Sequence, residues 1–192
     1  LRSDYQNQKY RLEDKLLKTF PEEIQKQKTR IAALQQDSQI AAAHPQDKEN
    51  FCGMTIKGMV YDDKKAAGER LLLARQEMPN ADMMLLGTYR GFELNIRFDS
   101  FKNEHQAVLR AELSYPVSLG DDARGNITRL DNAIDNFADR IADAENALQN
   151  LEQQKQAAEV EVAKPFAQEE ELQTKSARLA ELDACLLYTS DA

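Results

Sequence analysis

Residues 126–163 read NITRLDNAIDNFADRIADAENALQNLEQQKQAAEVEVA, and their apolar positions alternate steps of three and four. The positions on this seam are Ile127, Leu130, Ile134, Phe137, Ile141, Ala144, Leu148, Leu151, Lys155, Ala158 and Val162. Such spacing is the a/d pattern of a coiled coil, here interrupted only by one lysine. A single helix over this stretch is about 57 Å long at 1.5 Å per residue. Its apolar stripe must therefore be buried against a partner.

The first part of the sequence offers that partner. Apolar residues recur near the same spacing at Leu12, Leu16, Phe20, Ile24, Ile31, Leu34 and Ala41. Pro21 either kinks one helix or starts a second one at its first turn. Residues 1–44 carry a positive net charge and residues 121–164 a negative one. We therefore expect an antiparallel helical hairpin, a coiled coil whose arms are residues 1–44 and 121–164.

Between the arms, residues 45–120 predict a small α+β domain, because they hold six of the seven glycines and most alternating apolar patterns. One strand is expected near 54–60, and a helix capped by Asp62 or Asp63 is expected to run to about Glu77. Further strands are expected at 84–86, 92–98 and 107–113, with a tight turn at 89–91 and an end at Tyr115-Pro116. The predicted fold class is α+β: a long helical hairpin capped by a three- or four-stranded antiparallel sheet with one helix on its face.

The end of the sequence gives two further expectations. Pro165 breaks the long helix, and the acidic run after it favours a C-terminal helix within 165–184. Residues 185–192, CLLYTSDA, match the translation of a transposase sequencing adapter, so we interpret them as an artefact rather than a native apolar turn. Without Cys185 a single cysteine remains, and Cys52, at the start of an apolar run, is expected to be a buried structural thiol.

Composition and motifs argue against several functions. The mean hydropathy is −0.66, no run approaches the length of a membrane span, and no signal-peptide pattern is present, so we expect a cytoplasmic protein without a membrane partner. The patterns GxxxxGK[ST], GxGxxG, GxSxG and CxxC do not occur. His44 and His105 have no partner at metal-ligand spacing and are expected in surface loops. The acidic pairs 62–63 and 121–122 are better explained as helix caps than as acid–base pairs.

The sequence thus predicts no catalytic, cofactor-binding or metal-binding residue in this segment. Nucleic-acid contact is the remaining candidate, although the net charge of −8 does not attract phosphate. The candidate residues are Arg90, Arg124, Lys15 and Lys18. Exposed helix charge is the commoner explanation for the two lysines, and turn chemistry explains the arginines equally well, with Asn126 able to cap the helix that follows Arg124.

Several segments together resemble one protein family. They are 8–14 (QKYRLED) with Phe20-Pro21, 89–92 (YRGF), 119–132 (LGDDARGNITRLDN), 164–166 (KPF), 169–172 (EEEL) and 175–182 (KSARLAEL). This set resembles the C-terminal extension of very large Swi/Snf-type helicases found on conjugative and other mobile elements of bacteria. Many of those proteins also carry a DNA adenine methylase domain. The resemblance covers nearly all of residues 1–184.

The resemblance implies a part in an ATP-driven machine that acts on DNA. ATP and Mg²⁺ would bind to motor domains upstream of Leu1, so no catalytic residue of the family is carried onto this sequence. We expect a coiled-coil lever or an accessory module that contacts DNA or a partner protein. The alternative is an oligomerisation or protein-interaction module, possible as a homo-oligomer, without a nucleic-acid role.

Overall fold

The computed structural model describes residues 2–47, 50–78, 82–164 and 174–183. Compact packing divides the chain into two units, which we call the sheet unit (Lys26–Leu148) and the helical unit (Leu1–Gln25 with Gln149–Ala192). Residues 174–183 are helical, within the predicted C-terminal helix. The rest of that prediction, and the stretch interpreted as an adapter artefact, lie outside the described residues.

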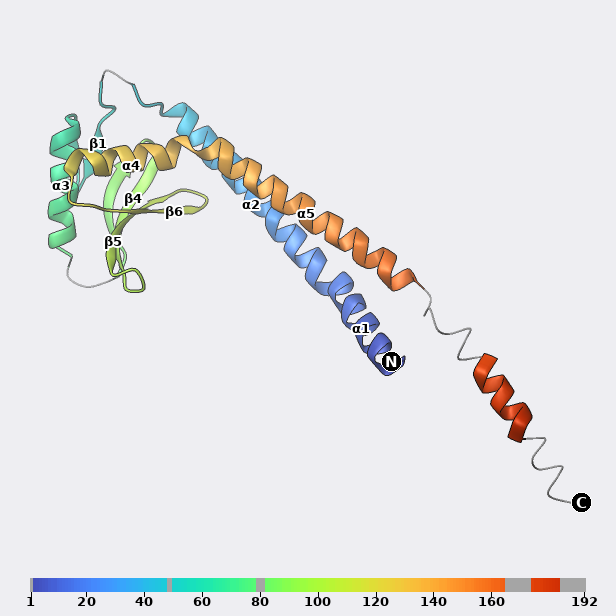
Figure 1. The fold of residues 1–192 in the computed structure, drawn as a ribbon. Helices are drawn as coiled ribbons and strands as arrows, with labels where there is room; N and C mark the ends of the chain where they lie inside the picture. The colour runs from blue at the N-terminus through green and yellow to red at the C-terminus, as the bar shows by residue number, and fades with distance from the viewer. Residues whose placement is uncertain (1, 48–49, 79–81, 165–173, 184–192) are drawn as a thin grey trace, which may run out of the picture. The chain divides into compact units, whose positions relative to one another are not determined.

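The fold is mixed α and β, which confirms the predicted class (Figure 1). The helices are α1 (Arg2–Asp14), a π-helical segment η1 (Lys15–Thr19), α2 (Phe20–Ala43), α3 (Lys64–Gln76), α4 (Ala123–Asp135) and α5 (Phe137–Ala163). The strands are β1 (Met54–Ile56), β2 (Met59–Tyr61), β3 (Met84–Tyr89), β4 (Phe92–Asp99), β5 (Glu104–Arg110) and β6 (Ser114–Ser118).

The sheet is larger than the sequence predicts. All six strands pair antiparallel in the order β2-β1-β3-β4-β5-β6, so the expectation of three or four strands is wrong. The predicted strand 54–60 is a hairpin, because Lys57 and Gly58 take positive φ values of 50° and 79° and reverse the chain. Pro116 does not end the sheet either. It lies in β6, an edge strand, where a residue without an N–H is tolerated.

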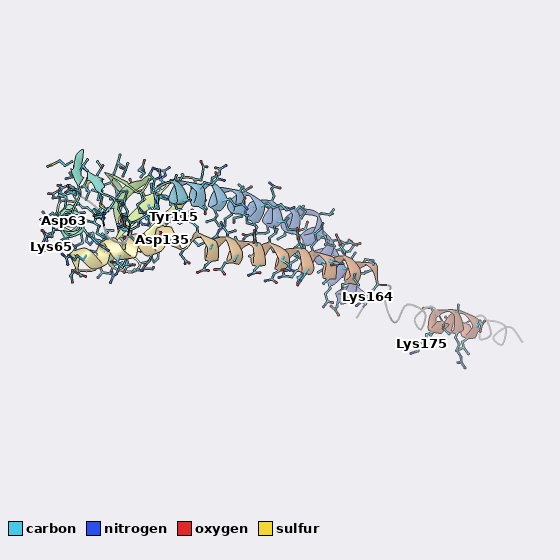
Figure 2. The ribbon with its side chains drawn as sticks, turned by 90° about the horizontal axis from the view of Figure 1, so that it is seen from above. Asp63, Lys65, Tyr115, Asp135, Lys164 and Lys175 are labelled. Carbon is cyan, nitrogen blue, oxygen red and sulfur yellow. The ribbon has the colours of Figure 1, made fainter. Side chains whose placement is uncertain are left out.

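Two helices cover one face of the sheet, where the sequence predicts one. Helix α3 begins as predicted, since the Asp63 carboxylate accepts a hydrogen bond from the backbone N–H of Ala66 at 2.8 Å. Helix α4 is capped by Asp122, which accepts from Gly125 at 2.8 Å, and not by Asn126. Both acidic pairs thus supply helix caps, as expected. Figure 2 labels Asp63 and Lys65 at the start of α3.

Helices α3 and α4 approach each other closely at Gly68. A Cβ atom there would lie 2.1 Å from the carbonyl oxygen of Ala123 and 2.5 Å from its carbonyl carbon. Real Cβ atoms do not approach backbone this closely, so any side chain at this position must push the two helices apart. The lack of a side chain therefore sets the distance between the two helices that cover the sheet.

We expect Gly68→Ala to lower the free energy of unfolding by about 1–3 kcal/mol, because overpacking here meets rigid backbone rather than a flexible side chain. The gain in helix propensity, about 1 kcal/mol, opposes this cost without cancelling it. Chemical denaturation measures the change. The control is Glu69→Ala at the next, exposed position, expected to stay within about 0.5 kcal/mol. Equal or greater stability of Gly68→Ala would contradict the close approach.

The long seam is buried as predicted, but it does not lie on one unbroken helix. The chain leaves helical geometry at Asn136 (φ −95°, ψ 25°), which separates α4 from α5. Every described seam position is buried or half-buried. The α4 part of the seam packs into the core with the sheet and α3, and the first part of α5 packs into the same core beside α2.

In the sheet unit, α2 and α5 share the hydrophobic core. Leu34 of α2 is 1% exposed, and Phe137 and Ala144 of α5 are 3% and 5% exposed. Ile31 of α2 and Ile141 of α5 pack against the same cluster. The predicted pairing of the two arms is therefore present in this unit. The same cluster also contains buried residues of the sheet, among them Leu94 and Leu109.

In the helical unit, Pro21 is the second residue of α2 and lies in the first turn of that helix, which is one of the two predicted alternatives. The N–H of Phe20 bonds to the carbonyl of Lys15, five residues back, which is the π-helical geometry of η1. Proline lacks the N–H for a bond to the residue four before it, and a widened turn accommodates that loss. The first arm is therefore helical throughout its described length to Ala43.

Candidate functional site

The turn between β3 and β4 carries the first candidate site. Arg90 and Gly91 have positive φ values of 47° and 80°, the geometry of a two-residue type I′ hairpin turn. A Cβ at Gly91 would lie 2.6 Å from the His44 ring, so glycine serves both the turn and the approach of the end of α2. The tight turn predicted at 89–91 is confirmed.

Arg90 is buried in the sheet unit, with 3% of its side chain exposed. Its Nη1 donates to Asp131 at 3.3 Å, its Nη2 to Asp135 at 2.8 Å, and its Nε to the His44 carbonyl at 2.9 Å. Tyr89 donates its hydroxyl to the same Asp131 oxygen at 2.6 Å. We call these residues, Tyr89, Arg90, Asp131, Asp135 and the His44 carbonyl, the ionic lock.

At neutral pH, Tyr89 and Arg90 of the ionic lock both stay protonated. Burial and the hydrogen bond to Asp131 raise the pKa of the Tyr89 hydroxyl far above its ordinary value. Burial lowers the pKa of Arg90, but the hydrogen bond and charge of Asp135 and the charge of Asp131 outweigh it and raise the pKa overall. Neither pKa is shifted toward pH 7, where the pKa of a general acid or base must lie. The arrangement is suited to holding segments together rather than to proton transfer.

Asp37 of α2 forms a second polar cluster in the sheet unit. Its side chain is completely buried, and it accepts hydrogen bonds from the backbone N–H groups of Glu112 and Leu113 at 2.9 and 3.0 Å. The Tyr115 hydroxyl donates a short bond to the same carboxylate. The cluster fixes the turn between β5 and β6 onto α2.

The candidate nucleic-acid residues fall in both units, the two arginines in the sheet unit and the two lysines in the helical unit. Arg90 is buried in the ionic lock, where its guanidinium makes three hydrogen bonds, which supports the turn interpretation. Arg124 is exposed in the first turn of α4, where its carbonyl accepts from Thr128 at 3.2 Å. Lys15 and Lys18 are exposed in η1 of the helical unit, and Lys18 pairs with Asp14 at 2.6 Å. Contact of Arg124 and the lysines with DNA stays a prediction.

The predictions for cysteine and histidine need two corrections. Cys52 is exposed rather than buried, and desolvation raises the pKa of its thiol, the opposite of an activated nucleophile. His105 lies in strand β5 rather than a loop, with its ring 5.0 Å from that of Phe98. Burial, and then the charge of Arg75, lower the pKa of His105, which favours the neutral ring. His44 is exposed after α2, as predicted.

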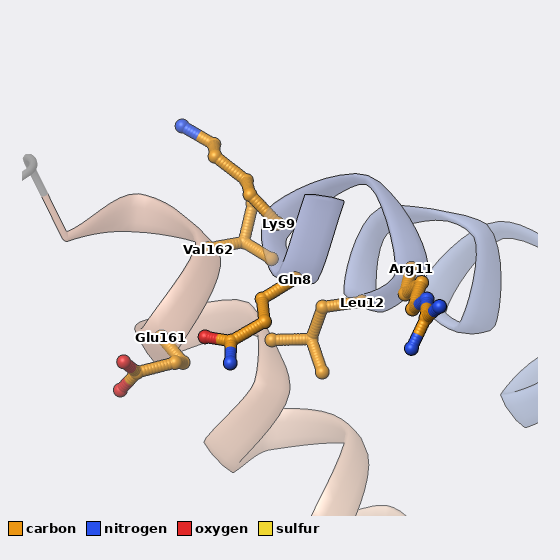
Figure 3. Close-up of a pocket in the computed structure, with 6 residues that line it drawn as sticks. All are labelled: Gln8, Lys9, Arg11, Leu12, Glu161 and Val162. Carbon is orange, nitrogen blue, oxygen red and sulfur yellow. The ribbon is translucent and has the colours of Figure 1, made fainter. Parts of the chain in front are cut away.

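A pocket of roughly 300 Å³ lies in the helical unit, between α1 and the end of α5 (Figure 3). Leu12 and Val162 give it an apolar floor, and Gln8 and Glu161 line it. The side chain of Lys9 extends away from it in Figure 3. Arg11 lines it as well, whereas Glu161 pairs with Lys164 at 2.7 Å. We interpret the pocket as a gap where the apolar stripe of the arms ends.

Within the described ranges, no three His, Cys, Asp or Glu side chains converge as a metal site. Nor is any helix among those residues long and apolar enough to cross a membrane. Comparisons with protein-family models, with curated proteins and with solved structures gave no match. Function is therefore inferred from the ionic lock, the Asp37 cluster and the sequence resemblance.

Proposed function

We propose that this chain is a non-catalytic coupling module of a larger ATP-dependent DNA helicase or translocase, of the kind that also carries a DNA methylase in many members. The module joins a helical arm to a sheet domain so that a displacement of one moves the other. ATP and Mg²⁺ act in the motor, and DNA or a partner protein is contacted by the sheet unit. The resemblance of residues 1–184 supports the choice of parent protein.

The ionic lock is the observation that carries this proposal. It joins the end of α2, the β3–β4 turn and α4, which are far apart in the sequence, through one buried guanidinium. A buried ion pair of this kind adds little net stability compared with apolar packing, but it specifies one arrangement of the segments it joins. A module that must transmit movement needs such a fixed attachment of helix to sheet.

The test is made in the full-length protein that contains the upstream motor. Deleting residues 45–120 is expected to reduce DNA-stimulated ATPase activity or DNA affinity, because the sheet is lost. Arg90→Gln is expected to leave basal ATPase activity intact and to lower the distance translocated per ATP hydrolysed. The matched control is Lys65→Gln, which removes one exposed charge from the sheet unit. If the deletion alters neither DNA-stimulated ATPase nor DNA affinity, the coupling role is wrong.

A second candidate function is self-association through the helices. Tyr10 and Leu17, seven residues apart on the first arm, are 68% and 78% exposed, and Val160 of α5 is 57% exposed. Large apolar side chains that point to solvent on helices are common at helix–helix interfaces. Sedimentation of the whole chain discriminates: a concentration-dependent dimer supports an oligomerisation module, and a monomer supports the intramolecular hairpin.

A further inference from the structure

A second pocket, of roughly 500 Å³, lies in the sheet unit and contains two arginines. Arg30 reaches it from α2 and Arg140 from α5, while Leu113, Ser114 and Pro116 line it from the β5–β6 hairpin. We call it the two-arginine pocket. Its size falls within the range of sites that hold small ligands or single groups of larger ones.

Arg140 is held in place by aromatic rings. Its guanidinium carbon lies 4.7 Å from the centre of the Tyr115 ring and 5.9 Å from that of Phe137. The two rings pack edge to face at 5.2 Å, and the Tyr115 hydroxyl is tied to Asp37. The guanidinium is therefore preorganised over a rigid surface, which lowers the entropy that a ligand must overcome on binding.

The charge in the pocket is not neutralised by its neighbours. In the described part of the chain, neither Arg30 nor Arg140 makes an ion pair, whereas Arg70, Arg75 and Arg90 all do. Asp37 is the buried acid at this place, and its oxygens are already occupied by two backbone N–H groups and the Tyr115 hydroxyl. Two guanidiniums against one saturated carboxylate leave an excess positive charge.

The charges of Arg30 and Arg140 both influence the hydroxyl group of Tyr115. Burial, followed by the hydrogen bond to Asp37, raises the pKa of the Tyr115 hydroxyl, and the charges of Arg140 and Arg30 oppose that rise. The two positive charges therefore lie near one phenol, Arg30 on α2 and Arg140 on α5, and all three residues line the same pocket. A purely structural role as counter-charges for Asp37 would place a guanidinium against its carboxylate, and no such ion pair is present among the residues described.

We propose that the two-arginine pocket binds a phosphodiester of a nucleic-acid strand. Arginine is suited to phosphate because its planar fork donates two parallel hydrogen bonds. The Ser114 side chain adds a hydroxyl, and Leu113 and Pro116 give apolar surface for a sugar or base. Lys26, one turn before Arg30 on the same helix and exposed, continues the positive charge along the path of a backbone. The choice of nucleic acid as the source of the phosphate rests on the proposed function.

The experiment measures binding of a labelled single-stranded oligonucleotide to the whole chain by fluorescence anisotropy over a range of salt concentrations. We expect R30Q/R140Q to weaken binding about tenfold or more, as loss of charged hydrogen bonds does. The slope of log K against log salt should become shallower by about 1.4, the value for two phosphate contacts on a single strand. The matched control is K28Q/K65Q, which removes two exposed positive charges outside the pocket and should change both quantities less.

Because Arg140 also packs on Tyr115, thermal unfolding of each variant accompanies the titration. R30Q alone removes an exposed side chain, so it keeps the fold and should show about half of the change in salt slope. Equal losses in the pocket variant and the control would overturn the proposal. So would binding of inorganic phosphate or a phosphopeptide without the oligonucleotide, or no binding at all. None of these results touches the coupling role, which is tested separately by ATPase activity in the full-length protein.

Discussion

Asp37→Ala is expected to lower the free energy of unfolding of the sheet unit by about 3–5 kcal/mol. The Asp37 carboxylate is completely buried and accepts three hydrogen bonds. Removing it leaves the N–H groups of Glu112 and Leu113 and the Tyr115 hydroxyl without an acceptor. Each unsatisfied buried donor costs about 1–3 kcal/mol, although water entering the new cavity recovers part of this. Denaturant unfolding followed by circular dichroism gives the value.

Two variants separate this explanation from a general effect of charge. Asp37→Asn keeps one acceptor oxygen but turns an amide toward the backbone donors, so it should fall between alanine and the native chain. Asp139→Ala removes an exposed acid from α5 and should stay within about 0.5 kcal/mol. A cost for Asp37→Ala no larger than that of Asp139→Ala would show that the three hydrogen bonds contribute nothing to stability.

The helical part of the fold is well predicted from sequence because its signal is local and periodic. Burial follows the seam from Ile127 to Val162 at nearly every expected position. The break at Asn136 has no comparable signal, since asparagine occurs elsewhere in the same helices without interrupting them. The period does not reveal which elements the seam contacts: α4 packs on the sheet and α3, whereas α5 contacts the sheet through Phe137, which stacks on Phe92, and also packs beside α2.

The sheet is less well predicted because its short strands depend on turns and neighbours. The dipeptides Lys57-Gly58 and Arg90-Gly91 form the same two-residue turn, yet only the second stands between long alternating runs. The β1–β2 hairpin has three residues on each side, too few to show a period of two. Pro116 favours a strand end by its own chemistry, and only the position of β6 at the sheet edge permits it.

The candidate site illustrates a different limit. Arg90 stands out in the sequence at the hairpin turn, but its carboxylate partners, Asp131 and Asp135, stand about forty residues later, within a stretch (121–145) that is rich in acids. No local pattern distinguishes them from the exposed acids around them. Asp37 can be recognised from the sequence, because it stands three residues after Leu34 and four residues before Ala41. This spacing places a charged residue on the apolar stripe of α2. A buried acid of this kind is the signal that the sequence reasoning missed.

Arg90→Gln is expected to cost about 3–5 kcal/mol of unfolding free energy, because it leaves the buried Asp131 without its guanidinium partner. Glutamine keeps a side chain at the same positive φ, so the backbone contribution to the change cancels. Lys64, 3.9 Å from the other oxygen of Asp131, compensates only in part. Chemical denaturation of the native chain and the variant measures this change.

The exposed pair of Lys18 and Asp14 provides the control, and it shows which variable decides the size of the effect. Its atoms are 2.6 Å apart, closer than Arg90 and Asp131 at 3.3 Å, but the two side chains are 74% and 60% exposed. Lys18→Gln should therefore cost little or no unfolding free energy. The double variant R90Q/D131N should recover part of the loss, because no uncompensated charge remains at position 131. If R90Q alone costs as little as Lys18→Gln, burial of the ionic lock does not hold α4 and the β3–β4 turn together, and the coupling role loses its physical basis.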